Sequence, residues 1–231
     1  MTPVGAMLFP AFVEYEALRY DVRTPFLYDP LDLPRELDQV SAARRAAFVA
    51  GRACARSALH RIAPTRVPEP IPIGADRAPV WPEGFIGAIS HTDGFACAAV
   101  ARTADASGVG LDSERIVPSE MTDAMQAQIA TIGEIDALRA RVNLDDRVLL
   151  TIIFSAKESL FKCLYPRVGR LFGFHAAAIV DISTGEASFR AELREPLGDW
   201  SRGAALEGRY LVGDGLVHTA LTLPTRVRMP R

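Results

Sequence analysis

The sequence predicts an α+β protein built from two subdomains of similar size, with a cleft between them. Three observations support this. A helix followed by strands occurs twice along the 231 residues. The strands come in pairs separated by turn signals such as Asp93-Gly94 and Asp214-Gly215, which are typical of antiparallel hairpins. A chain of this length suits one large or two small domains, because domains usually run to about 100–200 residues.

The first half begins with a loosely alternating segment from Leu8 to Val22, which fits one strand. A loop with prolines and aspartates is expected from Thr24 to Pro34, and a proline-rich loop from Pro64 to Pro72. A helix lies between these loops, with Ser41 as its candidate N-cap. Its apolar positions, at roughly helical spacing, are Phe48, Ala55, Leu59 and Ile62.

Three strands are predicted after the second loop, at 85–90, 95–101 and 109–116. The first two are joined by the Asp93-Gly94 turn. We expect all three to form an antiparallel meander.

The second half starts with a helical stretch from Thr122 to Arg141. A stronger helix is predicted from about Asp145 to Leu164, with Asp145 or Asp146 near its N-cap and Pro166 just beyond its end. Four short strands complete the chain, in pairs divided by turn signals. They are Ala177–Ile182, Ala187–Leu193, Ala204–Val212 and Val217–Leu223.

Composition narrows the classes of function. The net charge is −2 and no long basic block occurs, which argues against a nucleic-acid partner. The three cysteines lack the spacing of a metal site or a disulfide framework, so we expect buried thiols and a reducing cytoplasm. Neither a secretory signal nor a run of about 20 apolar residues is present, so no membrane association is expected.

A strand with two acidic residues is the first candidate site. In Gly110-Leu111-Asp112-Ser113-Glu114, Asp112 and Glu114 share one face because side chains alternate along a strand. Carboxylates so close repel unless a cation neutralises them, and Mg²⁺ typically binds one or two carboxylates together with substrate phosphates. A solvated acidic strand end fits the same pattern.

The second candidate lies on the helix near Lys157. Glu158 and Lys162 are four residues apart and therefore neighbours on the helix surface. An ordinary surface ion pair explains this spacing equally well. However, Lys157 and Lys162 are the only lysines of the chain, and both flank one glutamate on an otherwise apolar helix.

Phosphate-binding groups are the third candidate. Arg44 and Arg52 lie on the first helix, and each carries a guanidinium group that is able to bind two oxygens of one phosphate at once. Ser90 and His91 end a strand at a tight turn, where both are able to donate to a phosphate. A solvated helix face and a histidine that only caps the turn are the alternatives.

Taken in order, these segments resemble one family, the 4′-phosphopantetheinyl transferases, in particular the monomeric type that serves surfactin- and enterobactin-like synthetases. Its hallmarks are a G-[IV]-D-x-E strand and an F-S-x-K-E-[SA]-x-x-K helix. Residues 110–114 resemble the first, with Leu111 in place of the commoner Ile or Val, and residues 154–162 match the second. The pattern R-x-P-x-W-P-x-G-x-x-G-S-I-S-H matches residues 77–91 except at Ala88, and R-R-x-x-F-x-x-G-R-x-x-A-R resembles residues 44–56. The likeness runs from about Leu18 to Leu223.

The resemblance implies a pseudo-dimer of two α/β halves, residues 1–116 and 117–231, each a helix packed on a small antiparallel sheet. The active site is then expected in the cleft between them, with coenzyme A bound there. By resemblance, Mg²⁺ is held by Asp112, Glu114 and Glu158. The residues expected to bind coenzyme A are Arg44, Arg52, Arg77, Ser90, His91, Lys157 and Lys162.

The implied reaction moves phosphopantetheine to a serine of an apo acyl or peptidyl carrier protein, releases 3′,5′-ADP, and serves nonribosomal peptide, polyketide or siderophore synthesis. Phosphoryl transfer depends mainly on positioning and charge neutralisation. We expect Asp112, Glu158 and Lys162 to be catalytic, with Glu158 or a water that it activates as the base and Lys162 at the leaving oxygen. A cytoplasmic monomer is expected. A metal-dependent nucleotide pyrophosphate hydrolase and a non-catalytic carrier-binding module are the alternatives.

Overall fold

A computed structural model describes residues 3–21, 37, 39–65, 71–74 and 76–225. The loop predicted at Thr24–Pro34 and residues 66–70 of the proline-rich segment lie outside the described residues. The chain forms two compact units, residues 1–109 with 222–231, and residues 110–221. The strand that carries Asp112 and Glu114 thus belongs mostly to the second unit.

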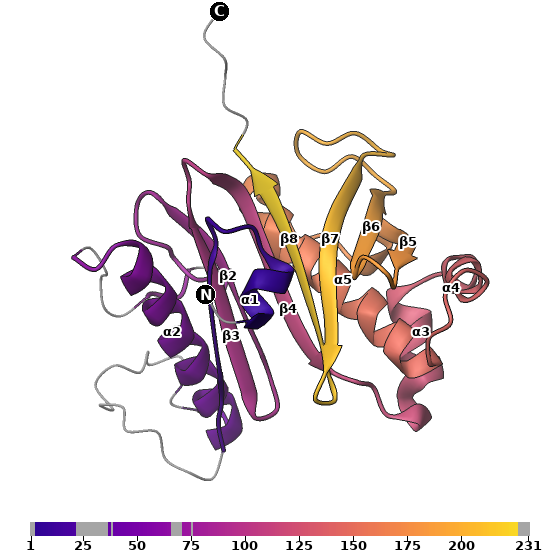
Figure 1. The fold of residues 1–231 in the computed structure, drawn as a ribbon, viewed down its shortest axis with the longest axis horizontal. Helices are drawn as coiled ribbons and strands as arrows, with labels where there is room; N and C mark the ends of the chain where they lie inside the picture. Colours follow the sequence, from indigo (N-terminus) through magenta and orange to yellow (C-terminus); the bar gives the residue numbers. More distant parts are fainter. Residues whose placement is uncertain (1–2, 22–36, 38, 66–70, 75, 226–231) are drawn as a thin grey trace, which may run out of the picture. The chain divides into compact units, whose positions relative to one another are not determined.

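The first unit is a helix packed on a three-stranded antiparallel sheet of order β1-β3-β2 (Figure 1). Glu14 of β1 and Gly87 of β2 both lie opposite Val100 of the central strand β3. Residues 96–101 of β3 are buried and mostly small, which lets α2 pack closely against them. The elements are α1 (Pro3–Leu8), β1 (Glu14–Arg19), α2 (Ala42–Ile62), β2 (Phe85–Thr92) and β3 (Phe95–Arg102).

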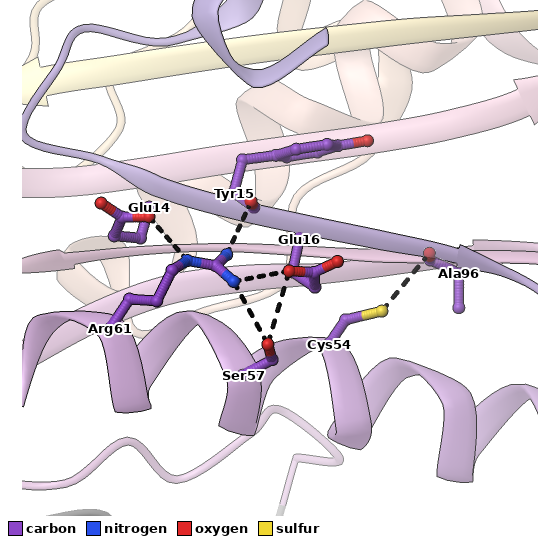
Figure 2. A network of polar contacts seen from close by, with 7 residues as sticks. All are labelled: Glu14, Tyr15, Glu16, Cys54, Ser57, Arg61 and Ala96. Carbon is purple, nitrogen blue, oxygen red and sulfur yellow. Dashed lines mark hydrogen bonds and ion pairs between the residues drawn. The ribbon is translucent and has the colours of Figure 1, made fainter. Parts of the chain in front are cut away.

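Helix α2 begins where the sequence predicts. The side chain of Ser41 accepts a hydrogen bond from the backbone N–H of Arg44, which satisfies one of the free donors of the first turn. Near its other end, Arg61 ties the helix to β1 (Figure 2). Its guanidinium binds Glu14 at 2.8 Å and Glu16 at 2.6 Å, and donates to the carbonyl of Tyr15.

The predicted meander is wrong for its third strand. This strand, β4 (Ala106–Arg115), is hydrogen-bonded to β8 (Leu216–Pro224) at one edge of a five-stranded sheet of order β4-β8-β7-β6-β5. Turn and alternation patterns indicate that a strand exists, but they do not identify a partner about a hundred residues away.

The second unit packs α5 against strands of this five-stranded sheet (Figure 1). The four predicted C-terminal strands are confirmed, and both Asp214 and Gly215 have positive φ, as a type I′ hairpin turn requires. The remaining elements are η3 (Ser119–Met121), α3 (Thr122–Ile129), α4 (Ile132–Arg139), α5 (Asp146–Val168), η4 (Phe174–Ala176), β5 (Ala177–Ser183), β6 (Ser188–Leu193) and β7 (Ala205–Gly213).

Two helix predictions need correction. The stretch from Thr122 to Arg141 is interrupted, because Thr131 caps a new helix by accepting from the N–H of Glu134. Helix α5 has the predicted N-cap, Asp145, but it continues through Pro166. Proline lacks one N–H, yet the turn is completed when the N–H of Gly169 donates to the carbonyl of Tyr165 at 2.9 Å.

The predicted α+β class and the pairing of a helix with an antiparallel sheet in each half are confirmed. The three cysteines, Cys54, Cys97 and Cys163, are buried free thiols as expected. None of the helices in the described residues combines the length and hydrophobicity that crossing a bilayer requires.

Candidate active site

Strand β4 comes unusually close to α5 at Gly110. A Cβ atom at this position would clash with the backbone oxygen of Ser159 and lie 2.8 Å from the Cβ of Cys163. Glycine is therefore required for this approach. Asp112, two residues further along, projects from the same face of β4.

Asp112 and Lys162 meet as an ion pair between β4 and α5. The Lys162 ammonium donates to Oδ1 of Asp112 at 2.6 Å. The Asp112 side chain is 2% exposed and that of Lys162 is 26% exposed. A charge covered to this extent needs such a partner, because burial without one is costly.

Glu158 lies on the same side of α5 as Lys162 and is half-buried. Burial raises the pKa of its carboxyl, the negative charge of Asp112 adds to the rise, and the positive charge of Lys162 opposes it. Glu158 therefore lies within the electrostatic field of both residues. The second unit thus carries all three residues predicted to be catalytic, with Asp112 and Lys162 in direct contact.

Glu114 is also half-buried on β4, on the face that Asp112 shares. Within the described residues, no three histidine, cysteine, aspartate or glutamate side chains are grouped closely enough to hold a metal ion. The donor chemistry nevertheless fits a hard divalent cation, which prefers carboxylate oxygens. Burial is the main cause of the raised pKa of Glu158, and a cation bound to its carboxylate would favour the charged form.

Hydrogen bonds fix α5 against the sheet near these residues. The hydroxyl of Thr219 on β8 donates to the carbonyl of Ser155 at 2.8 Å, and the two hydroxyls lie 2.9 Å apart. One turn earlier, the hydroxyl of Thr151 accepts from the N–H of Val117 at 3.1 Å. The motif serine, Ser155, therefore anchors the helix one turn before Glu158.

Lys157 is placed differently from the other predicted ligands. Its side chain is 2% exposed, and its ammonium donates to Glu134 at 3.0 Å and to the carbonyl of Ile129 at 2.7 Å. Both contacts are internal to the second unit. Lys157 is therefore not part of the site that we propose.

The first unit contains a cavity of about 760 Å³ lined by four of the predicted phosphate-binding residues. Arg44 and Arg52 reach it from α2, where they lie on one face together with Phe48 between them. Positive charge on several sides suits a polyanion such as a phosphorylated nucleotide. The full lining is Leu37, Val40, Arg44, Phe48, Arg52, Ile73, Gly74, Arg77, Pro79, Ile89 and His91.

Arg52 also supports the wall of this cavity. Its guanidinium lies 4.7 Å from the centre of the Phe48 ring and donates to the carbonyl of Ile71 at 3.0 Å. Burial lowers the pKa of Arg52 to about 10, so it remains charged at neutral pH. Next to it, Gly51 allows close contact with β2, since a Cβ there would lie 2.7 Å from the Ile89 side chain.

Arg77 stands in a strained backbone conformation, with φ of 67°. It lies in a tight turn in which its N–H donates to the carbonyl of Gly74 at 2.9 Å. Side chains other than glycine seldom adopt this conformation, at a cost of about 1–3 kcal/mol. The turn places Arg77 at the cavity despite that cost.

The two residues of the predicted Ser-His pair differ in their surroundings. His91 is exposed and lines the cavity, whereas Ser90 is 3% exposed and does not. Both belong to β2, where consecutive side chains point to opposite faces. The alternation of side chains along the predicted strand could have indicated that only one of the two residues faces the cavity.

Sequence reasoning missed three contacts in and around the site. Phe48 supports Arg52, although it was predicted only as part of the apolar face of the helix. The hydroxyl of Ser113 is buried and lies 2.8 Å from Nδ1 of His218. Glu134, the partner of Lys157, was not predicted either.

Comparison with known families gives two adjoining matches. The model of the 4′-phosphopantetheinyl transferase N-terminal domain matches residues 33–101. The model of the 4′-phosphopantetheinyl transferase superfamily matches residues 108–217. The first range contains the arginine-lined cavity, and the second contains Asp112, Glu158 and Lys162.

Individual relatives match most of the chain. The 4′-phosphopantetheinyl transferase Svp of Streptomyces mobaraensis is 36% identical over 207 residues, covering 84% of this chain and 80% of its own length. The 4′-phosphopantetheinyl transferase PptT of Mycobacterium tuberculosis is 30% identical, with 83% and 86% covered. Enterobactin synthase component D of Salmonella typhi is 33% identical, with 73% and 69% covered.

Proposed function

Because this chain belongs to the 4′-phosphopantetheinyl transferase superfamily, we propose that it moves phosphopantetheine from coenzyme A to a serine of an apo carrier protein. The observation that carries this proposal is the ion pair between Asp112 on β4 and Lys162 on α5, with Glu158 on the same side of that helix. In a phosphoryl transfer, a carboxylate is able to accept the proton of the attacking hydroxyl, and an ammonium group is able to neutralise negative charge on the phosphates.

Nucleotide binding is assigned to the cavity of the first unit. Arg44, Arg77 and His91 supply positive or hydrogen-bonding groups for the 3′-phosphate and the adjacent phosphates of coenzyme A. Arg52 binds less directly, because its guanidinium already holds the carbonyl of Ile71. The cavity volume, about 760 Å³, is within the range of small-molecule sites.

Mg²⁺ is the cofactor that the carboxylates favour. Asp112, Glu114 and Glu158 would hold it, and it would supply neutralisation of the pyrophosphate charge. Asp112 is the most firmly placed of the three, because its carboxylate is buried and tied to α5 through Lys162.

Proton transfer is assigned to Glu158. The serine hydroxyl of the carrier gives its proton to this carboxylate while its oxygen forms a bond to the β-phosphorus of coenzyme A. The bond from that phosphorus to the bridging oxygen breaks, and 3′,5′-ADP leaves. A raised pKa makes the Glu158 carboxylate a better proton acceptor than an exposed glutamate. Lys162 offsets the negative charge on the leaving oxygen.

The test is incubation of the protein with coenzyme A, Mg²⁺ and an apo carrier protein, followed by mass spectrometry of the carrier. We expect the carrier to gain one phosphopantetheine group and 3′,5′-ADP to accumulate in equal amount. Free phosphopantetheine with an unmodified carrier would instead indicate a hydrolase, and no reaction would contradict the proposal. A carrier in which alanine replaces the acceptor serine is the control.

A further inference from the structure

Lys157 and Glu134 form a buried ion pair away from the carboxylates of the proposed site. The ammonium of Lys157 lies 3.0 Å from Oε2 of Glu134, and the two side chains are 2% and 4% exposed. Lys157 occupies the buried side of α5, in helical register with Ile153, Leu160 and Leu164. An apolar residue would pack there at lower cost, because burying two charges is expensive.

The pair connects four elements of the second unit. The Lys157 ammonium also donates to the carbonyl of Ile129, the last residue of α3, where the helix dipole favours a cation. The other oxygen of Glu134, in the first turn of α4, accepts from the N–H of Ile179 at 2.8 Å. Ile179 lies beside a register irregularity of β5, which is an edge strand of the sheet.

These contacts restrict how α5 is able to rotate about its axis. Lys157 directly precedes Glu158, so a rotation that moved one would move the other. On another side, α5 carries Lys162, whose contact with Asp112 is 2.6 Å long. Besides the bonds of Ser155 to Thr219, two ion pairs therefore hold the helix, one to Glu134 through Lys157 and one to Asp112 through Lys162.

We propose that Glu134 is a positioning residue for the transfer reaction, which acts through Lys157 to set the orientation of α5 and with it the places of Glu158 and Lys162. This rests on the proposed function of Glu158 and Lys162. Neither Glu134 nor Lys157 touches the substrate in this scheme. The buried pair is hydrogen-bonded at both of its ends, to Ile129 and to Ile179. Such a link fixes the orientation of α5, which apolar packing alone would leave adjustable, and this explains why both charges are kept in the interior.

The two-lysine composition allows a direct structural test. A sample labelled with ¹⁵N at lysine Nζ gives one ammonium signal each for Lys157 and Lys162. In the Lys157→Met variant only Lys162 remains, so its signal is assigned without ambiguity. We expect that signal to shift or broaden relative to the wild type, because α5 is released from Glu134. An unchanged Lys162 signal would overturn the proposal, whether or not the protein proves to be a transferase.

The kinetic test uses the same variant and a charge-free double variant, Glu134→Gln with Lys157→Met. We expect kcat in Lys157→Met to fall about 10²-fold with little change in KM for coenzyme A, since displacement of catalytic groups by about 1 Å costs that much. Its melting temperature should fall by about 10 °C, because one buried charge is left unpaired.

The double variant separates positioning from stability. Without either buried charge, it should regain most of the wild-type melting temperature while kcat stays low and the Lys162 signal stays displaced. Recovery of kcat along with the melting temperature would show that the pair only stabilises the fold, and would overturn the proposal. The double variant also serves if the single variant does not fold.

A matched control breaks another link between the same two helices. Arg139 of α4 binds Asp146 of α5 at 2.8 Å, but both side chains are largely exposed. Arg139→Gln should leave the Lys162 signal and kcat unchanged within about twofold, because exposed pairs contribute little. If the wild type shows no transfer at all, the proposed function fails, and the Lys162 signal alone still decides whether Glu134 positions α5.

Discussion

Asp112 on β4 and Lys162 on α5 are joined by a 2.6 Å ion pair across 50 residues of sequence. The aspartate is almost fully covered, whereas about a quarter of the lysine side chain remains exposed. One end of the pair is thus fixed by the interior, and the other is accessible to a ligand. This arrangement makes Asp112 the residue whose loss should affect the chemistry most.

Asp112→Asn should lower the rate of carrier modification by at least about 10²-fold, because a charge aimed at the reacting groups is removed. The fold should survive, since asparagine has the same shape and still accepts from Lys162. Mass spectrometry of the carrier measures the rate, and thermal unfolding checks the fold. Glu207→Gln, an exposed carboxylate on β7, is the control and should behave as the wild type. Near-normal turnover of Asp112→Asn at saturating Mg²⁺ would contradict the assignment.

Glu158→Gln should stabilise the metal-free protein at neutral pH while abolishing transfer. Burial raises the pKa of Glu158 above its ordinary value of 4.5. An acid of this kind stabilises the fold below its ordinary pKa, and that contribution is lost as pH rises through the raised value. The variant should therefore match the wild type near pH 4 and exceed it at pH 7–8. Thermal unfolding in a chelator between these pH values measures the difference, and a constant difference would contradict the prediction.

Mg²⁺ should raise the melting temperature of the wild type but not that of Asp112→Asn or Glu158→Gln. A ligand that binds only the folded protein stabilises it by about 2.7 kcal/mol at a concentration a hundred times its Kd. The measurement is a titration of the melting temperature in the absence of coenzyme A and carrier, which does not depend on activity. An equal increase in the melting temperature of all three proteins would show that Mg²⁺ binds at a site other than Asp112 and Glu158.

Gly110→Ala should destabilise the protein by at least about 1–3 kcal/mol, because the added Cβ overlaps the backbone of Ser159 and separates β4 from α5. Transfer should fall in parallel, since Asp112 and Lys162 move apart. Gly133→Ala is the matched control. That glycine is helical and a Cβ there meets nothing within 4 Å, so the change should stabilise by up to about 1 kcal/mol. Denaturant unfolding distinguishes the two.

Arg77→Gly should weaken coenzyme A binding about 10–100-fold without loss of stability. The guanidinium is lost, but glycine relaxes the positive φ of 67°. Calorimetry with coenzyme A and with its 3′-dephospho form measures the affinity, and the loss should be smaller for the second ligand. Arg45→Ala is the control, because Arg45 is on α2 beside Arg44 but does not line the cavity. An equal loss of affinity for both ligands would show that Arg77 does not bind the 3′-phosphate.

Local patterns predicted the C-terminal strands and α5 well, because alternation, turn residues and the N-cap Asp145 are properties of short segments. The partner of β4 was not predictable in this way, because pairing with β8 depends on the whole sheet. The predicted end of α5 before Pro166 was wrong for a related reason. The helix continues past this proline and is completed by the hydrogen bond from the N–H of Gly169 to the carbonyl of Tyr165.

The same limit applies to the site. Spacing placed Asp112, Glu158 and Lys162 correctly on a strand and a helix, and the structure shows that these elements meet. Lys157 was expected, from the family resemblance, to bind coenzyme A together with Lys162. Its position in the buried stripe of α5 was a signal that it needs an internal partner, but nothing in the sequence identified Glu134. Only the packing of α4 beside α5 and β5 supplies that partner.

The placement of the two lysines also limits how the protein can be handled at the bench. One ε-amine is sealed inside and the other is partly shielded by a carboxylate. Amine-reactive dyes, crosslinkers and resins therefore have poor side-chain targets, and a reagent that reaches Lys162 would break its ion pair with Asp112. Surface attachment is better directed to an engineered cysteine, since the three natural thiols are all buried and give no background reaction.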